Sequence, residues 1–400
     1  MQIKNGKECT GCGACACACP QKCIEMKKNE EGFLYPVIDN TSCTECGVCR
    51  QKCPQEKNAD DMMAPQKIYA ASAKDKDVLK GCTSGGIVPT AAKAVLRQKG
   101  AVFGVEMGRD FRARVICVEN EKDLTRIRKS KYVQAATGIA YREAAYLLKT
   151  GRKVLYTGTP CQIAGLRRFL GKEYENLYTI DLVCHGVPSP EMFVSHVRYM
   201  EKKHGQRILR WNFRDKRAGG WSICDLIEFE HKERRQRELL DPYTWAFLKG
   251  LTLRESCYEC QYAQRKRFGD ITCGDYWGIE KAHPGFPDEQ GASMLMINTP
   301  KGEELFSMFR EDIWIEESCF ENAAKYNRTL IHPTLRPAAR GVIYKKWAQM
   351  PADGFEKKVL RPDTDLAETA RQYAPQWAKN LVRKIKRGMR KRKDPTGGQT

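Results

Sequence analysis

Eight cysteines near the N-terminus have a spacing that suits iron-sulfur clusters. A Cys-x2-Cys-x2-Cys-x3-Cys-Pro run occurs twice, with an offset of 34 residues. Three cysteines separated by two residues can bind three irons of one [4Fe-4S] cubane, and the fourth, before proline, then binds the other cluster. This rule predicts one cluster on Cys9, Cys12, Cys15 and Cys53, and a second on Cys43, Cys46, Cys49 and Cys19.

Zinc is the alternative for these thiolates, because zinc also takes four cysteines. Zinc ribbons, however, show separated Cys-x2-Cys pairs and not this run twice over, so clusters are the favoured interpretation. A module of about sixty residues cannot bury enough apolar surface to be stable alone, and we expect the clusters to hold it folded. Cys17 and Cys23 lie off the spacing and are expected to be small buried side chains.

Five further cysteines could form another site. Cys161 and Cys184 each follow an expected strand of one strand-helix-strand unit. Because parallel strands end at the same edge of a sheet, we expect these thiols at the edge where ligands of open α/β sheets bind. Cys257 and Cys260 would complete a four-thiolate set, with Cys273 as a spare candidate. A zinc knuckle and ordinary buried cysteines remain alternatives for these residues.

A glycine-containing loop and a basic turn could bind a phosphate or a dinucleotide. Residues 83–86, Thr-Ser-Gly-Gly, open an expected helix, whose free N–H groups and positive dipole end suit a phosphate. A serine N-cap is the alternative for this loop, and a solvated turn is the alternative for the basic segment. That segment surrounds Ser130 and Tyr132 with the cations Arg126, Arg128, Lys129 and Lys131.

One histidine also has a place that suggests chemistry. His185 lies between Cys184 and Gly186 at the expected carboxyl end of a strand, where it could transfer a proton near a redox centre. A histidine in this place can equally cap a loop. The other five histidines have no metal-ligand spacing, and the sequence contains no P-loop and no GxGxxG fingerprint.

The elements that must position these residues are those of an α/β protein behind a small module. Residues 87–96 have a helical apolar face, and residues 153–183 predict a strand-helix-strand unit with parallel strands. Two short strands around residues 29–32 predict a hairpin in the module. The fold class is therefore an α+β ferredoxin-like module followed by an α/β body with a mostly parallel sheet. The expected boundaries are 1–60 for the module, 67–150 and 151–325 for the two parts of the body, and 340–400 for a basic, partly helical tail.

The positive charge of the chain belongs to the body and the tail. The formal net charge is +20, yet residues 1–56 hold seven basic and seven acidic side chains, whereas residues 361–400 hold eleven basic and four acidic ones. From Trp377 to Met389 an apolar residue recurs at every fourth position among basic residues, a pattern typical of helices on anionic membranes. A frayed, solvated tail is an equal alternative. Nucleic acid ranks third, since no motif for reading bases accompanies the charge.

Composition bears on the cellular compartment. The nineteen cysteines include ten within the first 53 residues, which indicates metal binding in a reducing compartment. The N-terminus lacks the apolar region of a signal peptide, and no run of about 18 apolar residues occurs. We therefore expect a cytoplasmic protein, which would lie at the inner face of the membrane if the tail binds lipid.

Six motifs follow one another along the body of the chain, at residues 81–88, 130–134, 158–162, 184–186, 256–260 and 269–278. In their types and their order these motifs resemble the beta subunit of coenzyme F420 hydrogenases and dehydrogenases, a deazaflavin-dependent family. The resemblance covers residues 1–325, with the ferredoxin module fused in front, and six motifs in the right order make it specific.

The resemblance implies an FAD in the body and a third [4Fe-4S] cluster there. Carried over by motif, this cluster would be bound by Cys161, Cys184, Cys257 and Cys260; Cys273 is left out because relatives often have an aliphatic residue at that place. The flavin would lie against three short segments of the body, which are Ser84-Gly85-Gly86, Ser130-Lys131-Tyr132 and Gly158-Thr159-Pro160.

The activity implied by the resemblance is that of an iron-sulfur flavoprotein oxidoreductase. Electrons would pass between the clusters and FAD for the two-electron reduction or oxidation of an organic substrate, either a deazaflavin coenzyme or a metabolite of a glycan pathway. A ferredoxin or a dehydrogenase subunit would be the redox partner. A non-catalytic electron-transfer subunit of a larger complex is the alternative, and a zinc-stabilised nucleic-acid-binding protein is a remote one.

Overall fold

The N-terminal module contains the hairpin that its sequence predicts. The computed structural model describes residues 6–56, 62–237, 240–287, 289–360 and 362 of the chain. In the module, β1 (Ile24–Lys28) pairs with β2 (Leu34–Ile38) in an antiparallel hairpin. Two short helices, α1 (Ala14–Ala18) and α2 (Val48–Gln51), carry parts of the two cysteine repeats.

The body is built on one large mixed sheet. Its central strands β11, β7, β6 and β4 are parallel, and the strands on either side are antiparallel to their neighbours. The expected parallel arrangement is therefore confirmed for the centre, and antiparallel strands extend the sheet on both sides. In spatial order the strands are β13 (Ile313–Glu317), β3 (Lys67–Ala73), β12 (Ser293–Ile297), β11 (Ile271–Asp275), β7 (Leu177–Leu182), β6 (Val154–Gly158), β4 (Ala101–Met107) and β5 (Ala113–Val118).

Helices cover both faces of this sheet, because successive residues of a strand point to opposite sides. One face is covered by α4 (Ile87–Arg97), α5 (Leu124–Ile127) and α12 (Pro300–Ser307), and the other by α6 (Ala140–Lys149) and α7 (Pro160–Leu170). Val102 and Leu155 belong to the core beneath α4, whereas Phe103 and Tyr156 belong to the core beneath α6 and α7. The predicted strand-helix-strand unit, β6-α7-β7, has neighbouring parallel strands as expected.

A second, smaller sheet builds the other end of the body. It consists of β8 (Ile208–Asn212), β9 (Cys224–Phe229) and β10 (Glu233–Arg237), and it shares an aromatic-rich core with α8 (Pro190–His204), α10 (Pro242–Leu248), α14 (Ala339–Gln349) and α15 (Ala352–Lys358). The start of the expected tail thus contributes Tyr344 and Phe355 to this core. The amphipathic segment from Trp377 to Met389 lies outside the described residues.

The remaining elements are short. They are α3 (Lys76–Gly81), α9 (Lys216–Gly219), α11 (Ile279–Ala282), α13 (Phe320–Ala324), and the 3-10 helices η3 (Glu255–Cys257), η4 (Arg310–Asp312) and η5 (Arg328–Leu330). No helix in the described part of the chain combines the length and the apolar character needed to cross a membrane.

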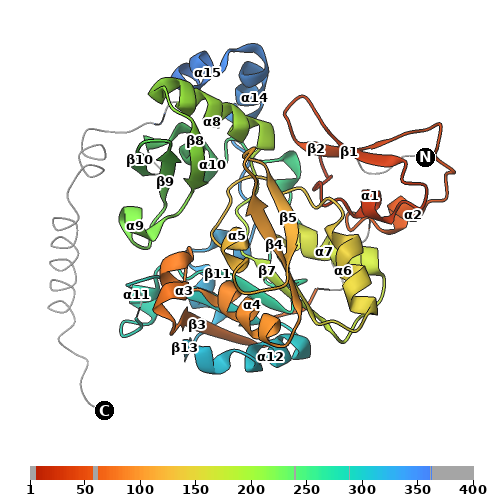
Figure 1. The fold of residues 1–400 in the computed structure, drawn as a ribbon, viewed down its shortest axis with the longest axis vertical. Helices are drawn as coiled ribbons and strands as arrows, with labels where there is room; N and C mark the ends of the chain where they lie inside the picture. The colour runs from red at the N-terminus through yellow and green to blue at the C-terminus, as the bar shows by residue number, and fades with distance from the viewer. Residues whose placement is uncertain (1–5, 57–61, 238–239, 288, 361, 363–400) are drawn as a thin grey trace, which may run out of the picture.

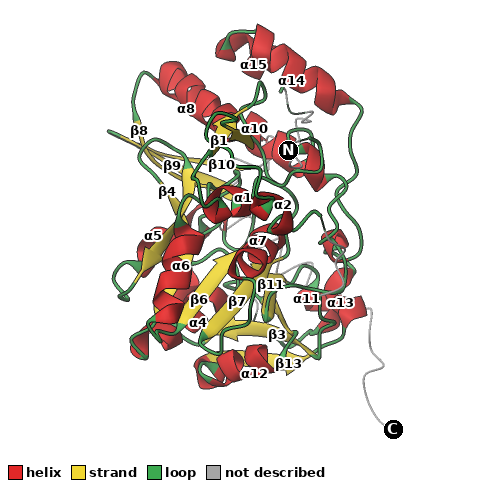
Figure 2. Ribbon diagram, turned by 90° about the vertical axis from the view of Figure 1, so that its right-hand side faces the viewer, coloured by secondary structure: helices red, strands yellow, loops and turns green. Residues whose placement is uncertain are grey.

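The module packs against α6 and α7 of the body. Figure 1 shows it, in red, beside these two helices, and Figure 2 shows α1 and α2 near α7. The Oγ1 of Thr137 donates to the carbonyl of Cys12 at 2.9 Å, and the Nε of Arg142 donates to that of Cys17 at 2.7 Å. These contacts hold the cysteine loops of the module against α6 and the residues before it. Helix α1 also packs on α7, the helix that carries Cys161.

Candidate metal centres and cofactor site

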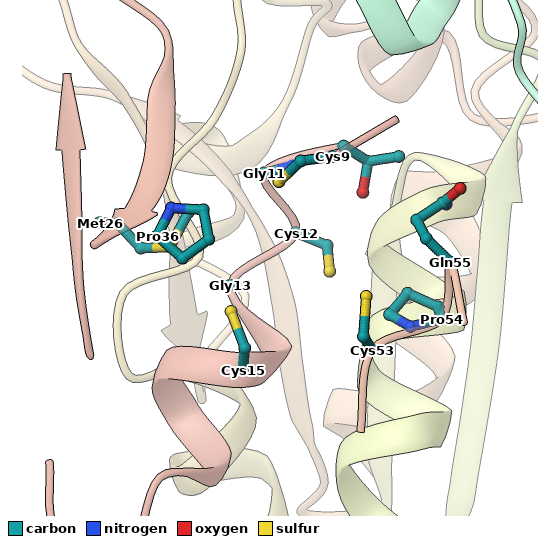
Figure 3. A pocket seen from close by; sticks show the side chains of 11 residues that line it. Cys9, Gly11, Cys12, Gly13, Cys15, Met26, Pro36, Cys53, Pro54 and Gln55 are labelled. Atoms are coloured by element: carbon teal, nitrogen blue, oxygen red, sulfur yellow. The ribbon is translucent and has the colours of Figure 1, made fainter. Parts of the chain in front are cut away.

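The first cysteine set lines a cavity at the base of the module. The cavity has a volume of about 370 Å³, and Met26 and Pro36 of the hairpin close one of its sides. Figure 3 shows the sulfur atoms of the set around this common space. Its fourth member comes from the second repeat, as the sequence rule requires. The first set consists of Cys9, Cys12, Cys15 and Cys53.

The second cysteine set lines a similar cavity of about 350 Å³ further from the body. Its members are Cys19, Cys43, Cys46 and Cys49, of which Cys46 is exposed. A fifth thiol, Cys23, also lines this cavity, and its Sγ lies 3.4 Å from that of Cys19. The spacing rule missed this position, because Cys23 precedes β1 and lies outside both repeats. Cys17 is buried as expected, and its thiol donates to the carbonyl of Gly138 at 3.1 Å.

The third cysteine set gathers four thiols from three distant segments of the body. Cys161 lies in the first turn of α7, Cys184 follows β7, and Cys257 and Cys260 lie at and just after η3. Burial, with a smaller contribution from Cys161, raises the pKa of Cys184 to about 12 and that of Cys260 to about 11. Burial also raises the pKa of Cys257, with contributions from all three partners. The carboxyl ends of β6 and β7 therefore bring the predicted thiols together.

Two other features bear on this set. Cys273 lies inside β11, buried in the apolar core on the α4 side of the sheet. Gly186 has a φ of +122°, and a Cβ there would lie 2.6 Å from Leu253 Cδ1 and 3.2 Å from Cys257 Cβ. The glycine after His185 thus allows η3 to approach the end of β7. Within the described residues, no three His, Cys, Asp or Glu side chains converge closely enough for a single metal ion.

The three sets form a row. Cys49 of the second set raises the pKa of Cys15 in the first set, and Cys161 of the third set raises that of Cys12, in each case adding to the effect of burial. Residues four apart share one face of a helix, and a Cβ on Gly165, four residues after Cys161, would lie 3.0 Å from Cys12 Sγ. Helix α7 therefore contacts the first set and supplies a thiol to the third.

The loop at residues 83–86 is held against the sheet. The Oγ of Ser84 donates to the carbonyl of Ala292 at 2.9 Å, and the N–H of Gly85 donates to Ser293 Oγ at 3.0 Å. A Cβ on Gly85 would lie 2.4 Å from the carbonyl oxygen of Ala71. Gly86 has a left-handed backbone and is the N-cap of α4. The Ser84 hydroxyl and the Gly85 N–H therefore do not fit the expected role of phosphate donors, because they hold the loop on the sheet.

The basic turn fits an anionic group better. The N–H of Ser130 donates to Thr83 Oγ1 at 3.0 Å, which brings the turn against the loop. Arg126 and Lys129 pair with carboxylates, whereas no described carboxylate pairs with Arg128 or Lys131. The Nε of Arg128 is buried without a hydrogen-bond partner, and loss of hydration lowers the pKa of Lys131 to about 7. These two cations lack the counter-charge that a phosphate would bring.

Aromatic rings connect this turn to the third cysteine set. Tyr132 stacks on Phe247 with ring centroids 4.6 Å apart, and His185 meets the same ring edge-on at 5.1 Å. The Nε2 of His185 lies 3.1 Å from the Phe247 carbonyl, and its Nδ1 lies 3.4 Å from Thr334 Oγ1. Burial lowers the pKa of His185. Both ring nitrogens are thus engaged by protein groups beside Cys184.

The turn at Gly158, Thr159 and Pro160 caps α7. The N–H of Thr159 donates to Gln162 Oε1 at 3.1 Å, and its Oγ1 lies 3.2 Å from the Sγ of Cys161. The Nε2 of Gln162 donates to the carbonyl of Ala135 at 3.4 Å, which joins this turn to the segment that follows the basic turn. The three segments expected to contact the flavin therefore lie at the carboxyl side of the central strands. The loop at residues 83–86 and the basic turn contact each other directly, whereas the turn at residues 158–160 is joined to them through the segment that follows the basic turn.

Three family models match the chain. One describes the C-terminal part of the beta subunit of coenzyme F420 hydrogenase/dehydrogenase and matches residues 151–322. The corresponding model for the N-terminal part of the same protein matches residues 68–141. A third, described as a 4Fe-4S dicluster domain, matches residues 8–57. The first two cover most of the body, and the third covers both cysteine repeats.

Two curated proteins and one solved structure are similar to the chain. The F subunit of the F420H2 dehydrogenase from Methanosarcina mazei is 24% identical over 336 residues, which are 77% of this chain and 84% of that protein. The coenzyme F420-dependent sulfite reductase of Methanocaldococcus jannaschii is 24% identical over 335 residues, which are 79% of this chain but 48% of the reductase. A chain of the F420-reducing [NiFe] hydrogenase complex from Methanosarcina barkeri matches with a TM-score of 0.44 and 17% identity, over 76% of this chain and 94% of that one.

Proposed function

The chain belongs to the family of coenzyme F420 hydrogenase/dehydrogenase beta subunits and carries a 4Fe-4S dicluster domain at its N-terminus, and we propose that it is an iron-sulfur flavoprotein that transfers electrons between a redox partner protein and a small organic substrate. The observation that carries this proposal is the row of three cysteine sets. The row begins at the exposed Cys46 and ends at the half-buried third set, beside the carboxyl ends of the central strands.

The proposed cluster ligands are the members of the three cysteine sets. Four thiolates are the donor set that a [4Fe-4S] cluster takes, and each of the first two sets surrounds a cavity of its own. Clusters of this kind exchange single electrons, and a flavin exchanges one or two. The protein shields the inner thiols from water and leaves the second set near the surface, where a partner can approach. Because metal binding requires thiolates, filling the half-buried third set should release protons.

The proposed flavin is FAD. Its anionic part is assigned to Lys131 and Arg128, neither of which forms an ion pair with a described carboxylate. Tyr132 and the turn at Gly158, Thr159 and Pro160 are proposed to bound the remainder of the cofactor. The loop from Ser84 to Gly86 is proposed to shape the site, since two of its polar groups already hold it to the sheet.

The proposed substrate is a two-electron carrier or metabolite that binds over the flavin. Both curated relatives have coenzyme F420 in their names, which makes a deazaflavin the first compound to test. A metabolite of a glycan pathway is the other substrate class. His185 is proposed as a proton-transfer group, and a His185→Gln variant should then lower kcat and change its pH profile. If the histidine only holds the segment after β7 against Phe247 and Thr334, the variant should lower cluster content instead.

The decisive test is metal and flavin analysis of anaerobically purified protein. We expect about twelve irons, about twelve sulfides and one FAD per chain, at four irons per cluster. Reduction of a deazaflavin by the isolated chain with an artificial donor would support the enzyme. Clusters without any turnover would favour a non-catalytic electron-transfer role in a larger complex, an interpretation that the name of the Methanosarcina mazei relative, one subunit of a dehydrogenase, supports. Colourless protein that contains zinc and no iron would contradict both.

A further inference from the structure

Arg254 joins the first and third cysteine sets. Its side chain is fully buried, and its Nε donates to the carbonyl of Cys9 at 2.6 Å. Its own carbonyl accepts from the N–H of Cys257 at 2.9 Å. The residue therefore contacts the module through its guanidinium and the third set through its backbone. Sequence analysis did not single it out, because it lies three positions before the nearest cysteine of the motif.

The charge of Arg254 has no described carboxylate to balance it. Two other buried arginines, Arg267 and Arg340, pair with carboxylates. Arg254 instead has the ring of Tyr35 at 3.8 Å from its Cζ, and its Nη2 is buried without a hydrogen-bond partner. A buried charge without a counter-charge is costly, so this guanidinium requires an anion nearby.

The structure makes room for the guanidinium beside the first set. Gly11 lies between Cys9 and Cys12 and has a φ of +68°, and a Cβ there would lie 3.1 Å from Arg254 Nη1. The same Cβ would lie 2.5 Å from Gln134 Nε2, the side chain whose Oε1 accepts from Arg254 Nη1 at 3.2 Å. Glycine at this position thus allows the arginine and its hydrogen-bonded partner to reach the cysteine loop.

We propose that Arg254 is a positioning residue whose positive charge is shared by the clusters on the first and third cysteine sets and raises the reduction potential of both. The inference rests on the proposed function, because it requires those clusters. A cluster gains negative charge on reduction, and a fixed cation in a medium of low dielectric constant stabilises the reduced form.

A redox titration followed by electron paramagnetic resonance tests the proposal. Arg254→Gln removes the charge and keeps a hydrogen-bond donor, whereas Arg254→Lys keeps the charge. In R254Q we expect the reduction potentials of the first and third clusters to be lower than in the wild type. At a fixed applied potential, the ratio of reduced to oxidised cluster should fall at least tenfold for each, which corresponds to a shift of about 59 mV for a one-electron couple. In R254K we expect a much smaller fall. The second cluster should be unaffected in both variants.

Arg142→Met is the matched control. Arg142 also donates from the body to the backbone of the module, to the carbonyls of Ala16 and Cys17, but its side chain is only half-buried, so water screens its charge. We expect R142M to leave all three potentials unchanged. A shift in R142M as large as that in R254Q would show that loosening the module is sufficient, and would overturn the role of charge.

The remaining outcomes separate this inference from the proposed function. Wild-type protein without the expected iron would end the proposed function itself. R254Q with full iron and unchanged potentials would overturn the inference and leave the proposed function intact. If R254Q loses iron, the R254K variant distinguishes the two explanations. Reduction potentials close to those of the wild type in R254K would support the shared charge. A tenfold fall in the ratio of reduced to oxidised cluster, or loss of iron, in R254K would show that Arg254 has a structural role only.

Discussion

The second and third cysteine sets place the same four donor groups in different ways. The second set lies within residues 19–49, lines a cavity in a module with little core of its own, and includes the exposed Cys46. The third set draws thiols from residues 161–260 and lies at the edge of a sheet whose two faces are packed by helices. Locally spaced thiols can thus be placed without a core, whereas distant ones depend on the fold around them.

The largest expected effect distinguishes metal-dependent folding of the module from metal-independent folding of the body. Cys12→Ser in the first set should lower the iron content by about four irons per chain or more. It should also make residues 8–57 susceptible to protease, since the clusters hold this small module folded. Cys184→Ser in the third set should also cost about four irons but leave the body folded, while transfer of electrons from the module to the flavin is abolished. Iron analysis, limited proteolysis and single-turnover flavin reduction measure these effects. Unfolding of the body in C184S would contradict the comparison.

A smaller effect is expected at the interface between the N-terminal module and the body. Arg340 is buried and pairs with Glu31 of the module hairpin and with Glu255, at 2.8 Å, beside the third set. Arg340→Met should lower the free energy of unfolding by about 3 kcal/mol, because it leaves the Glu31 carboxylate without its cation and removes one of the two cations beside Glu255. The control is Arg336→Met, whose more exposed ion pair with Glu255 should contribute at most about 1 kcal/mol. If urea denaturation gives equal losses of unfolding free energy for R340M and R336M, the buried ion pairs of Arg340 do not specifically hold the module on the body.

The body should also show a pH dependence that the module lacks. Burial lowers the pKa of His196, but Glu356 and Asp241, at 2.9 and 3.0 Å, raise it more strongly, to about 10 from the ordinary 6.5. The stabilisation by the imidazolium is therefore complete below pH 6.5 and lost as the pH rises toward 10. We expect the free energy of unfolding to fall by a few kcal/mol over this range. Denaturation of His196→Gln, which has no such proton, should lack this decline.

The smallest effect concerns the proposed flavin site. With the pKa of Lys131 lowered to about 7, less of the side chain is charged as the pH rises above 7. The affinity for FAD should then weaken, approaching tenfold per pH unit. Lys131→Arg keeps the charge and should remove this dependence, whereas Lys131→Met should bind weakly at every pH. Fluorescence titration with FAD measures these affinities. Unchanged binding by K131M would place the flavin elsewhere.

Elements with a local signal were predictable from the sequence. Apolar periodicity located α4, α7 and the strands β6 and β7, and turn residues located the hairpin. The antiparallel strands β3, β12 and β13 were not placed, because pairing between strands far apart in the chain leaves no periodic signal. The roles expected for Ser84 and Gly85 depend in the same way on Ala292 and Ser293, more than 200 residues away.

Cysteine spacing by itself determined which cysteines line the first two pockets together, including the exchange of the fourth cysteine between repeats, since the geometry of a cubane and a short loop leaves few alternatives. Only the tertiary structure decided that these sets form a row with the third, that Arg254 lies between two of them, and that Arg128 and Lys131 are the cations without described carboxylates. Each of those facts is a contact or a balance of charge between residues brought together by packing, and such contacts have no expression in local sequence.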